Sequence, residues 1–191
     1  MSAFEHVIAL LSFVYALALT HLLLSIAAMI RAGSRVRFSI VFAFWMANAF
    51  VVIIANWISL WDIRALQSFG VGTILFTFML AFVNYIQAAL VCPELPSQGA
   101  LDLWEFHQRE GRRYLAAVVA SLVMAVLANI IYGGVYSLAE LSRENVATIP
   151  MLVISLVAAI YVRAWWIQIA CVVAMTGLWT FYLLVLQGAL R

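Results

Sequence analysis

The sequence predicts an all-α fold, a polytopic transmembrane helical bundle of six transmembrane helices with one cytoplasmic interfacial helix. Two features of the composition support this class. Apolar residues make up 68 % of the chain, whereas charged residues make up only 9 %. The apolar residues also form blocks long enough to cross a hydrocarbon core, which requires about 20 residues of helix.

The blocks predict where each span lies within a single transmembrane domain, residues 1–191. We expect helices at about 4–30, 38–61, 69–91, 114–138, 149–162 and 166–187. The last apolar block, Ile149–Gln187, would be about 60 Å long as one helix, twice the bilayer core, so it must fold back once. Arg163, Trp165 and Trp166 mark the reversal because arginine and tryptophan both prefer the membrane interface.

The loop after the third helix predicts the interfacial helix. Pro93 and Pro96 end the preceding helix. The segment Leu101–Arg109 then has an amphipathic pattern typical of a helix lying at the membrane surface. We expect Trp104 to face the acyl chains and Glu105 to face water or Arg109.

The arginines predict the orientation of the chain. All ten basic residues are arginines. With six spans, one side carries Arg31, Arg35, Arg37, Arg109, Arg112, Arg113 and Arg163, whereas the other carries Arg64, Arg143 and Arg191. The positive-inside rule then places the long loop in the cytoplasm and both termini in the periplasm. The net charge of only +2 does not favour nucleic-acid binding.

The remaining chemistry-bearing residues do not predict a metal centre. Cys92 and Cys171 lack the spacing of a redox pair or a zinc site, and we expect them to be small apolar fillers. His6 lies beside Glu5 at the outer edge of the first helix. A metal site there is conceivable, but a solvated acidic rim is the better interpretation.

Polar residues inside the membrane mark the candidate site, because intramembrane polar groups are costly. Helix three carries a polar stripe, helix two places Asn48, Asn56 and Ser59 on one face, and helix six contributes Thr176. His21, Asn48 and Asn84 each lie about 15 Å from the cytoplasmic ends of their helices. The predicted ligand or proton pathway comprises Thr20, His21, Asn48, Thr77, Asn84, Gln87 and Thr176.

His21 is the centre of this hypothesis. We expect its imidazole to face the bundle interior within reach of Asn48 and Asn84, because a ring turned to lipid would leave its nitrogens unsatisfied. Such a cluster suits either a satisfied structural histidine or a proton relay. A third interpretation uses His6 and His21 as axial ligands of two haems in a dimer; otherwise no cofactor is expected.

Helix four has small or polar residues at successive i+4 steps, a pattern that permits close helix packing. The stripe comprises Ala117, Ser121, Ala125, Asn129 and Gly133. It predicts close contact with another helix, within the chain or in a homo-oligomer.

Two motifs resemble a group of small bacterial inner-membrane proteins. The first helix contains Phe4-Glu5, Ser12 and Thr20-His21-Leu22-Leu23, and the central loop contains Asp102-Leu103, Glu105, His107 and Arg112-Arg113 followed by Tyr114. The group has F-E…S…T-H-L-L and D-L…E…H…R-R at these places. The resemblance implies a bacterial inner membrane and no particular activity.

Three functions are compatible with these observations. The polar layer favours a unit that binds or conducts a small solute, proton or ion. The short loops and the helix-four stripe instead favour a non-catalytic accessory subunit of a larger membrane complex. The two histidines alone would favour a haem-binding redox protein.

Overall fold

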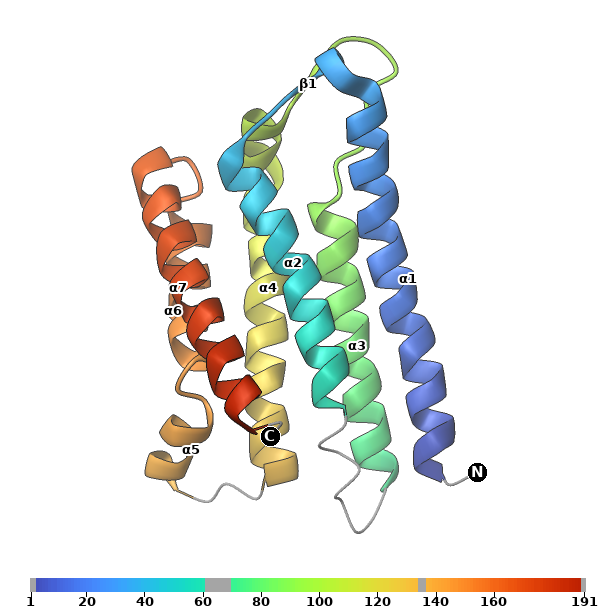
Figure 1. Cartoon of the computed structure of the whole chain (residues 1–191), viewed down its shortest axis with the longest axis vertical. Coiled ribbons are helices and arrows are strands. Elements are labelled where there is room, and N and C mark those ends of the chain that lie inside the picture. The colour runs from blue at the N-terminus through green and yellow to red at the C-terminus, as the bar shows by residue number, and fades with distance from the viewer. Residues whose placement is uncertain (1–2, 61–69, 134–136, 190–191) are drawn as a thin grey trace.

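The structure, a computed structural model, describes residues 3–60, 70–133 and 137–189, and confirms the all-helical prediction. Its elements are α1 (Ala3–Ala32), η1 (Gly33–Arg35), β1 (Val36–Arg37), α2 (Ile40–Ser59), α3 (Val71–Val91), β2 (Leu101–Asp102), α4 (Leu103–Gly133), α5 (Leu138–Glu144), α6 (Thr148–Ile160) and α7 (Trp165–Ala189). Within the described residues, α1, α2, α3, α4 and α7 are long and apolar enough to span a membrane. The long helices run side by side, and α1 begins and α7 ends in the lower half of Figure 1.

Helices α3 and α4 form the centre of the bundle. Helix α4 packs most extensively on α3 and α6, and α3 also packs on α1 and α2. Helix α7 lies against α6 and α2. Helix α1 stands at the edge (Figure 1), and its buried side chains form a single stripe. That stripe is Leu11, Tyr15, Ala18 and Leu22.

Two connections are joined at one end of the bundle. Val36 and Arg37 pair in parallel with Leu101 and Asp102. The Arg35 guanidinium also donates to the backbone carbonyl of Pro96 at 2.7 Å. The chain leaves α1 through Gly33, whose φ of +53° favours glycine. The α1–α2 connection is therefore tied to the α3–α4 loop, a contact that the hydropathy pattern does not predict.

The separate interfacial helix expected at 101–109 is wrong, since Leu101 and Asp102 form β2 and the residues from Leu103 onward begin α4 itself. Asp102 Oδ1 accepts from the backbone N–H of Trp104 at 2.9 Å and of Glu105 at 3.0 Å, which caps the helix. Nothing between this cap and residue 114 breaks a helix, so α4 starts at Leu103. Glu105 is exposed, as expected. Arg109 pairs with Glu110 at 3.3 Å.

The predicted reversal in the last apolar block is confirmed. Helix α6 ends at Ile160, α7 begins at Trp165, and Arg163 is exposed in the turn between them. At 13 residues α6 is only about 20 Å long, shorter than a hydrocarbon core, so a sixth complete span stays a prediction. The expected ends of the second and third helices, at 61 and 69, and Arg64 and Arg191 lie outside the described residues.

Seven arginines lie at one end of the bundle, which we call the arginine end. They occupy the end of α1, the β1 connection, the start of α4 and the α6–α7 turn, at the top of Figure 1. We call the opposite end, where α2 ends and α6 begins, the far end.

Candidate functional site

The seven predicted site residues do not all lie in the interior of the bundle. Asn48, Thr77, Asn84 and Gln87 are buried, whereas Thr20, His21 and Thr176 are exposed. The Thr176 hydroxyl donates to the carbonyl of Val172 in its own helix at 2.8 Å. The described structure therefore divides the predicted pathway into an interior group and an outer group.

The expectation that His21 faces the bundle interior is wrong. Its side chain is exposed, and its ring centroid lies 6.5 Å from that of Tyr85. The buried stripe of α1 includes Leu22, and neighbouring helical residues differ in direction by about 100°. His21 therefore lies outside the buried stripe, and its described ring neighbour is Tyr85 of α3.

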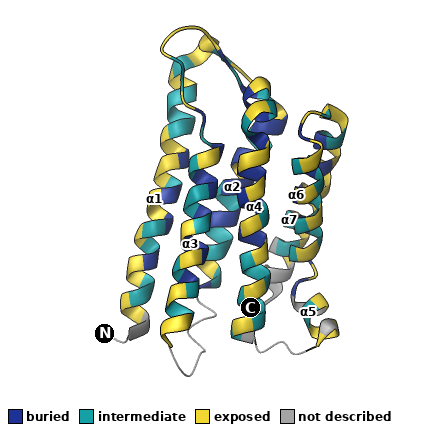
Figure 2. Cartoon of the chain, turned by 180° about the vertical axis from the view of Figure 1, so that it is seen from behind, coloured by how far each residue is buried: buried dark blue, intermediate teal, exposed yellow. Residues whose placement is uncertain are grey.

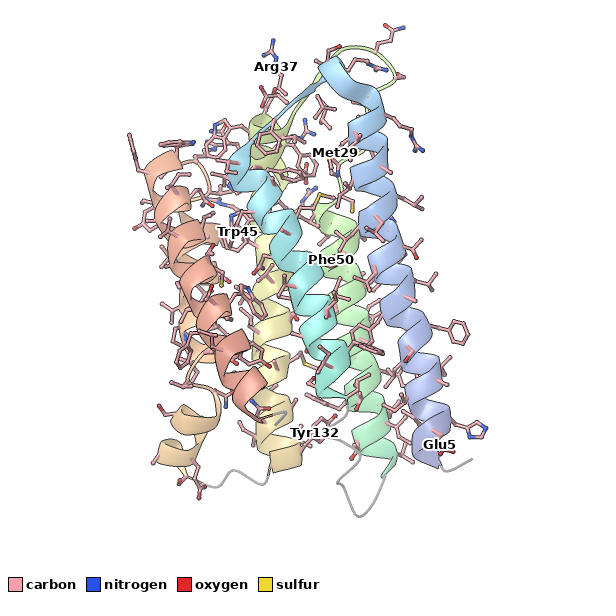
Figure 3. All side chains as sticks on the ribbon, in the orientation of Figure 1. Glu5, Met29, Arg37, Trp45, Phe50 and Tyr132 are labelled. Carbon is pink, nitrogen blue, oxygen red and sulfur yellow. The ribbon has the colours of Figure 1, made fainter. Side chains whose placement is uncertain are left out.

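The buried predicted residues mainly join helices. Asn84 on α3 accepts from the Ser121 hydroxyl on α4 at 2.9 Å. Thr77 shares a 2.7 Å hydrogen bond with Tyr132 at the end of α4, labelled in Figure 3. Among the described residues, neither amide atom of Gln87 has a partner. Small and polar residues here hold α3 against α4, as is common in membrane bundles.

The helix-four stripe also faces the interior of the same chain. Ala117 and Ser121 are buried, and Ala125 and Asn129 line a cavity described below. These described members provide no outward face for a second copy, so the homo-oligomer stays a prediction without support from the stripe.

A polar cavity of about 230 Å³ lies between α2, α4, α6 and α7. Its polar lining residues are Asn56, Ser59, Asn129 and Thr148, and its aromatic lining residues are Trp179 and Tyr182. Ser59 is the last residue of α2 and Thr148 the first of α6. The cavity therefore extends to the far end of these helices.

Two amide oxygens in this cavity are free to accept hydrogen bonds. Asn56 Nδ2 donates to the carbonyl of Val52 at 2.9 Å, and Asn129 Nδ2 donates to Asn145 Oδ1 at 2.7 Å. Both Nδ2 atoms are thus engaged, whereas neither Asn56 nor Asn129 has a partner for its Oδ1 among the described residues. Two residues that line the cavity therefore each have an amide oxygen without a described partner.

Aromatic rings form another wall of the cavity. The rings of Trp179 and Tyr182 lie 5.6 Å apart, nearly perpendicular at 82°. Trp179 is held in place because its Nε1 donates to Asn48 Oδ1 at 2.7 Å. Among the lining residues, none is acidic, basic or histidine. The site therefore combines neutral acceptors with π faces.

A second polar group, at the arginine end, is closed. His107 is buried, its Nδ1 and the Tyr114 hydroxyl share a hydrogen bond, and Trp104 stacks on its ring at 5.2 Å between ring centroids. The other ring nitrogen, Nε2, is buried and has no partner among the described residues. Gln168 Nε2 donates to the carbonyls of Ala158 at 2.8 Å and Tyr161 at 3.2 Å. These are orphan carbonyls at the end of α6, so Gln168 caps that helix.

The same group ties α2 and α4 to the α6–α7 turn. Trp45, which faces α7 in Figure 3, donates from Nε1 to Gln168 Oε1 at 3.2 Å. On α4, a Cβ added to Gly111 would lie 2.4 Å from Val162 Cγ2 in the turn. Only glycine lets the turn approach this closely. We call His107, Tyr114, Gln168, Trp45 and Gly111 the closed cluster.

The sequence pattern includes some of these residues but predicts other roles for them. The shared face of Asn48, Asn56 and Ser59 and the stripe containing Asn129 were both visible as helical spacings. Spacing does not show that two such faces meet around a cavity. His107 and Tyr114 belong to the loop motif, but the expected loop helix separated them from the bundle.

No protein family, curated protein or solved structure matches this chain.

Proposed function

We propose that this chain is an integral membrane protein that binds a small polar solute in the cavity between α2, α4, α6 and α7. The observation that supports this most directly is the pair of unpartnered oxygens of Asn56 and Asn129 in a space of about 230 Å³. A water molecule occupies about 30 Å³ in the liquid, so several waters or one small solute would fit. Polar groups without protein partners favour a guest that supplies the missing hydrogen bonds.

The chemistry of the lining favours a solute that donates hydrogen bonds. Two amide oxygens can accept hydrogen bonds from it. The faces of the Trp179 and Tyr182 rings attract the positively polarised N–H groups of an ammonium or amide, and for a cation this attraction contributes about 0.5–2 kcal/mol to binding. No lining residue carries a charge that would bind an anion. A small amine, ammonium or amide is the class that fits.

The orientation follows from the arginines. We propose that the arginine end is cytoplasmic, that both termini are periplasmic, and that the membrane is a bacterial inner membrane, as the resemblance implies. In this arrangement α6 is a shortened sixth span. The first turns of α4, with Arg109, Arg112 and Arg113, take the interfacial place expected for a separate helix. The cavity then lies toward the periplasmic side.

A chain that binds the solute could also conduct it across the membrane, and the closed cluster is the part of the structure that bears on this choice. At the arginine end, Trp45, Tyr114, Gln168 and His107 Nδ1 are hydrogen-bonded within the protein, and the α6–α7 turn packs closely against Gly111 of α4. Conduction would therefore require the α6–α7 turn to move away from α4. The alternative, a non-catalytic accessory subunit, predicts that the cavity binds no solute at all.

A binding experiment tests this function. The purified chain in detergent is titrated with methylammonium chloride, with urea as a neutral donor and with sodium acetate as an acceptor-only probe, while intrinsic tryptophan fluorescence is measured. We expect methylammonium or urea to change the fluorescence saturably and acetate to have no effect. Asn56→Leu should abolish the response, because it removes an acceptor and fills the cavity.

The matched control is Thr176→Val. Thr176 is exposed and outside the cavity, so this variant should respond like the wild type. A chain that responds to none of the donors, or an Asn56→Leu variant that responds fully, would refute solute binding at this site and favour the accessory-subunit alternative.

A further inference from the structure

A large apolar groove opens between α1 and α2 at the arginine end, away from the polar cavity. Its volume is about 670 Å³. Helix α1 contributes Leu23, Met29 and Ile30, and α2 contributes Ala47 and Phe50. All of its lining residues are apolar or glycine. In Figure 3, Met29 and Phe50 lie in the space between these two helices, below Arg37.

The groove has the length of one bilayer leaflet. Along α1 it extends from Leu23 to Gly33, about 15 Å of helix, which is half of a hydrocarbon core of about 30 Å. Its upper end is formed by Gly33, Val36 and Phe38 in the α1–α2 connection. It therefore begins at the level of the arginines and ends near the bilayer centre.

Unneutralised positive charge surrounds the upper end. Arg31 follows directly on Ile30 of the groove, is exposed, and has no partner among the described residues. Arg35 donates only to backbone carbonyls, so no described carboxylate cancels its charge. Arg37 pairs loosely with Asp102 at 3.8 Å and remains 76 % exposed.

The groove has apolar walls and ends at exposed arginines, a combination that fits a lipid with an anionic headgroup. An acyl chain is narrow enough to lie in the groove. Arginines next to the membrane attract anionic lipids, at about 1 kcal/mol each.

We propose that the α1–α2 groove is a binding site for one anionic phospholipid of the arginine-end leaflet. Its acyl chain lies between α1 and α2, and its phosphate lies beside Arg31 and Arg35. This site is independent of the proposed solute cavity, which lies among α2, α4, α6 and α7.

Native mass spectrometry of the full chain tests the proposal. The protein is purified in a mild detergent, equilibrated with equal amounts of phosphatidylglycerol and phosphatidylcholine, and the retained lipids are counted. We expect one retained lipid, mainly phosphatidylglycerol. Ala47→Phe fills the groove and should remove the retained lipid, whereas Arg31→Gln should keep the lipid but lower the preference for phosphatidylglycerol about fivefold.

Each variant has a matched control. Ala120→Phe places the same ring at an exposed position of α4 outside the groove, and Arg112→Gln removes an exposed arginine at the same end. Both should bind lipid like the wild type. Ala47→Leu, a smaller filling, serves if Ala47→Phe fails to accumulate.

Three outcomes would overturn the proposal. The first is a wild type that retains both lipids equally. The second is an Ala47 variant that binds lipid as well as Ala120→Phe does. The third is a wild-type dimer that Ala47→Phe dissociates, which would make a second copy the occupant.

Discussion

The closed cluster at the arginine end and the polar cavity at the far end use similar residues in different ways. Each includes a tryptophan whose indole N–H donates to a buried amide: Trp45 donates to Gln168 in the closed cluster, and Trp179 of the cavity lining donates to Asn48 behind it. In the closed cluster, Gln168 also satisfies two carbonyls of α6. In the cavity, Asn56 and Asn129 keep accepting atoms that no described residue uses. The closed cluster also keeps one buried atom without a described partner, His107 Nε2. The two regions therefore differ in that the unpartnered oxygens of Asn56 and Asn129 belong to residues lining a cavity, whereas the closed cluster is packed against the α6–α7 turn.

The burial of α4 side chains also differs between the arginine end and the far end. The buried side chains of α4 all lie between Leu103 and Leu122, and its described residues beyond Leu122 are half-buried or exposed. Figure 2 shows this change from dark blue to teal and yellow down the helix. The bundle is closely packed where the α6–α7 turn meets α4 and more open toward the far end, where the cavity lies.

Gln168→Leu should have the largest effect on stability. It leaves the Trp45 indole N–H and the carbonyls of Ala158 and Tyr161 without partners, at a total cost of about 2–4 kcal/mol. Thermal unfolding in detergent, followed by circular dichroism, should show a markedly lower midpoint. Thr180→Val, which changes an exposed hydroxyl of α7, is the control. Equal midpoints for the two variants would contradict a structural role for the closed cluster.

Gly111→Ala should destabilise by about 1–3 kcal/mol, because its Cβ would lie 2.4 Å from Val162 and force the turn away from α4. Gly177→Ala on α7 is the matched control, since nothing lies within 4 Å of a Cβ added at that position. That control should be neutral or more stable by up to about 1 kcal/mol. The same unfolding measurement applies, and a stable Gly111→Ala chain would show that the contact with Val162 is dispensable.

Ala125→Leu should lower affinity for the donor solute at least about tenfold with little change in stability. Ala125 lines the cavity, and the larger side chain takes up space that a guest needs. Ala120→Leu, on an exposed face of α4, should bind normally. Fluorescence titration with methylammonium and urea measures the difference. Unchanged affinity in Ala125→Leu would place binding elsewhere.

His21→Asn should have the smallest effect. The imidazole is exposed at the edge of the bundle, and substitutions of this kind change stability by about 0.5 kcal/mol or less. Solute binding should also be unchanged, as judged by the same titration. Loss of binding in a folded His21→Asn chain would restore the original hypothesis of a site around this histidine.

The sequence by itself determined the helical class, most helix positions, the reversal at Arg163 and the gathering of arginines at one end. Each of these depends on local hydropathy or on the order of charges along the chain, which a sequence states directly. It also identified Asn56, Ser59 and Asn129 as members of polar faces.

Only the tertiary structure decided which faces meet. Depth along a helix placed His21 level with Asn48 and Asn84, but depth does not specify rotation or neighbours, and α1 stands at the edge. The cavity and the closed cluster both join α7 to α2, which are distant in sequence, through hydrogen bonds such as Trp179 to Asn48. Hydropathy does not specify such contacts, because they depend on how the helices are arranged around α4.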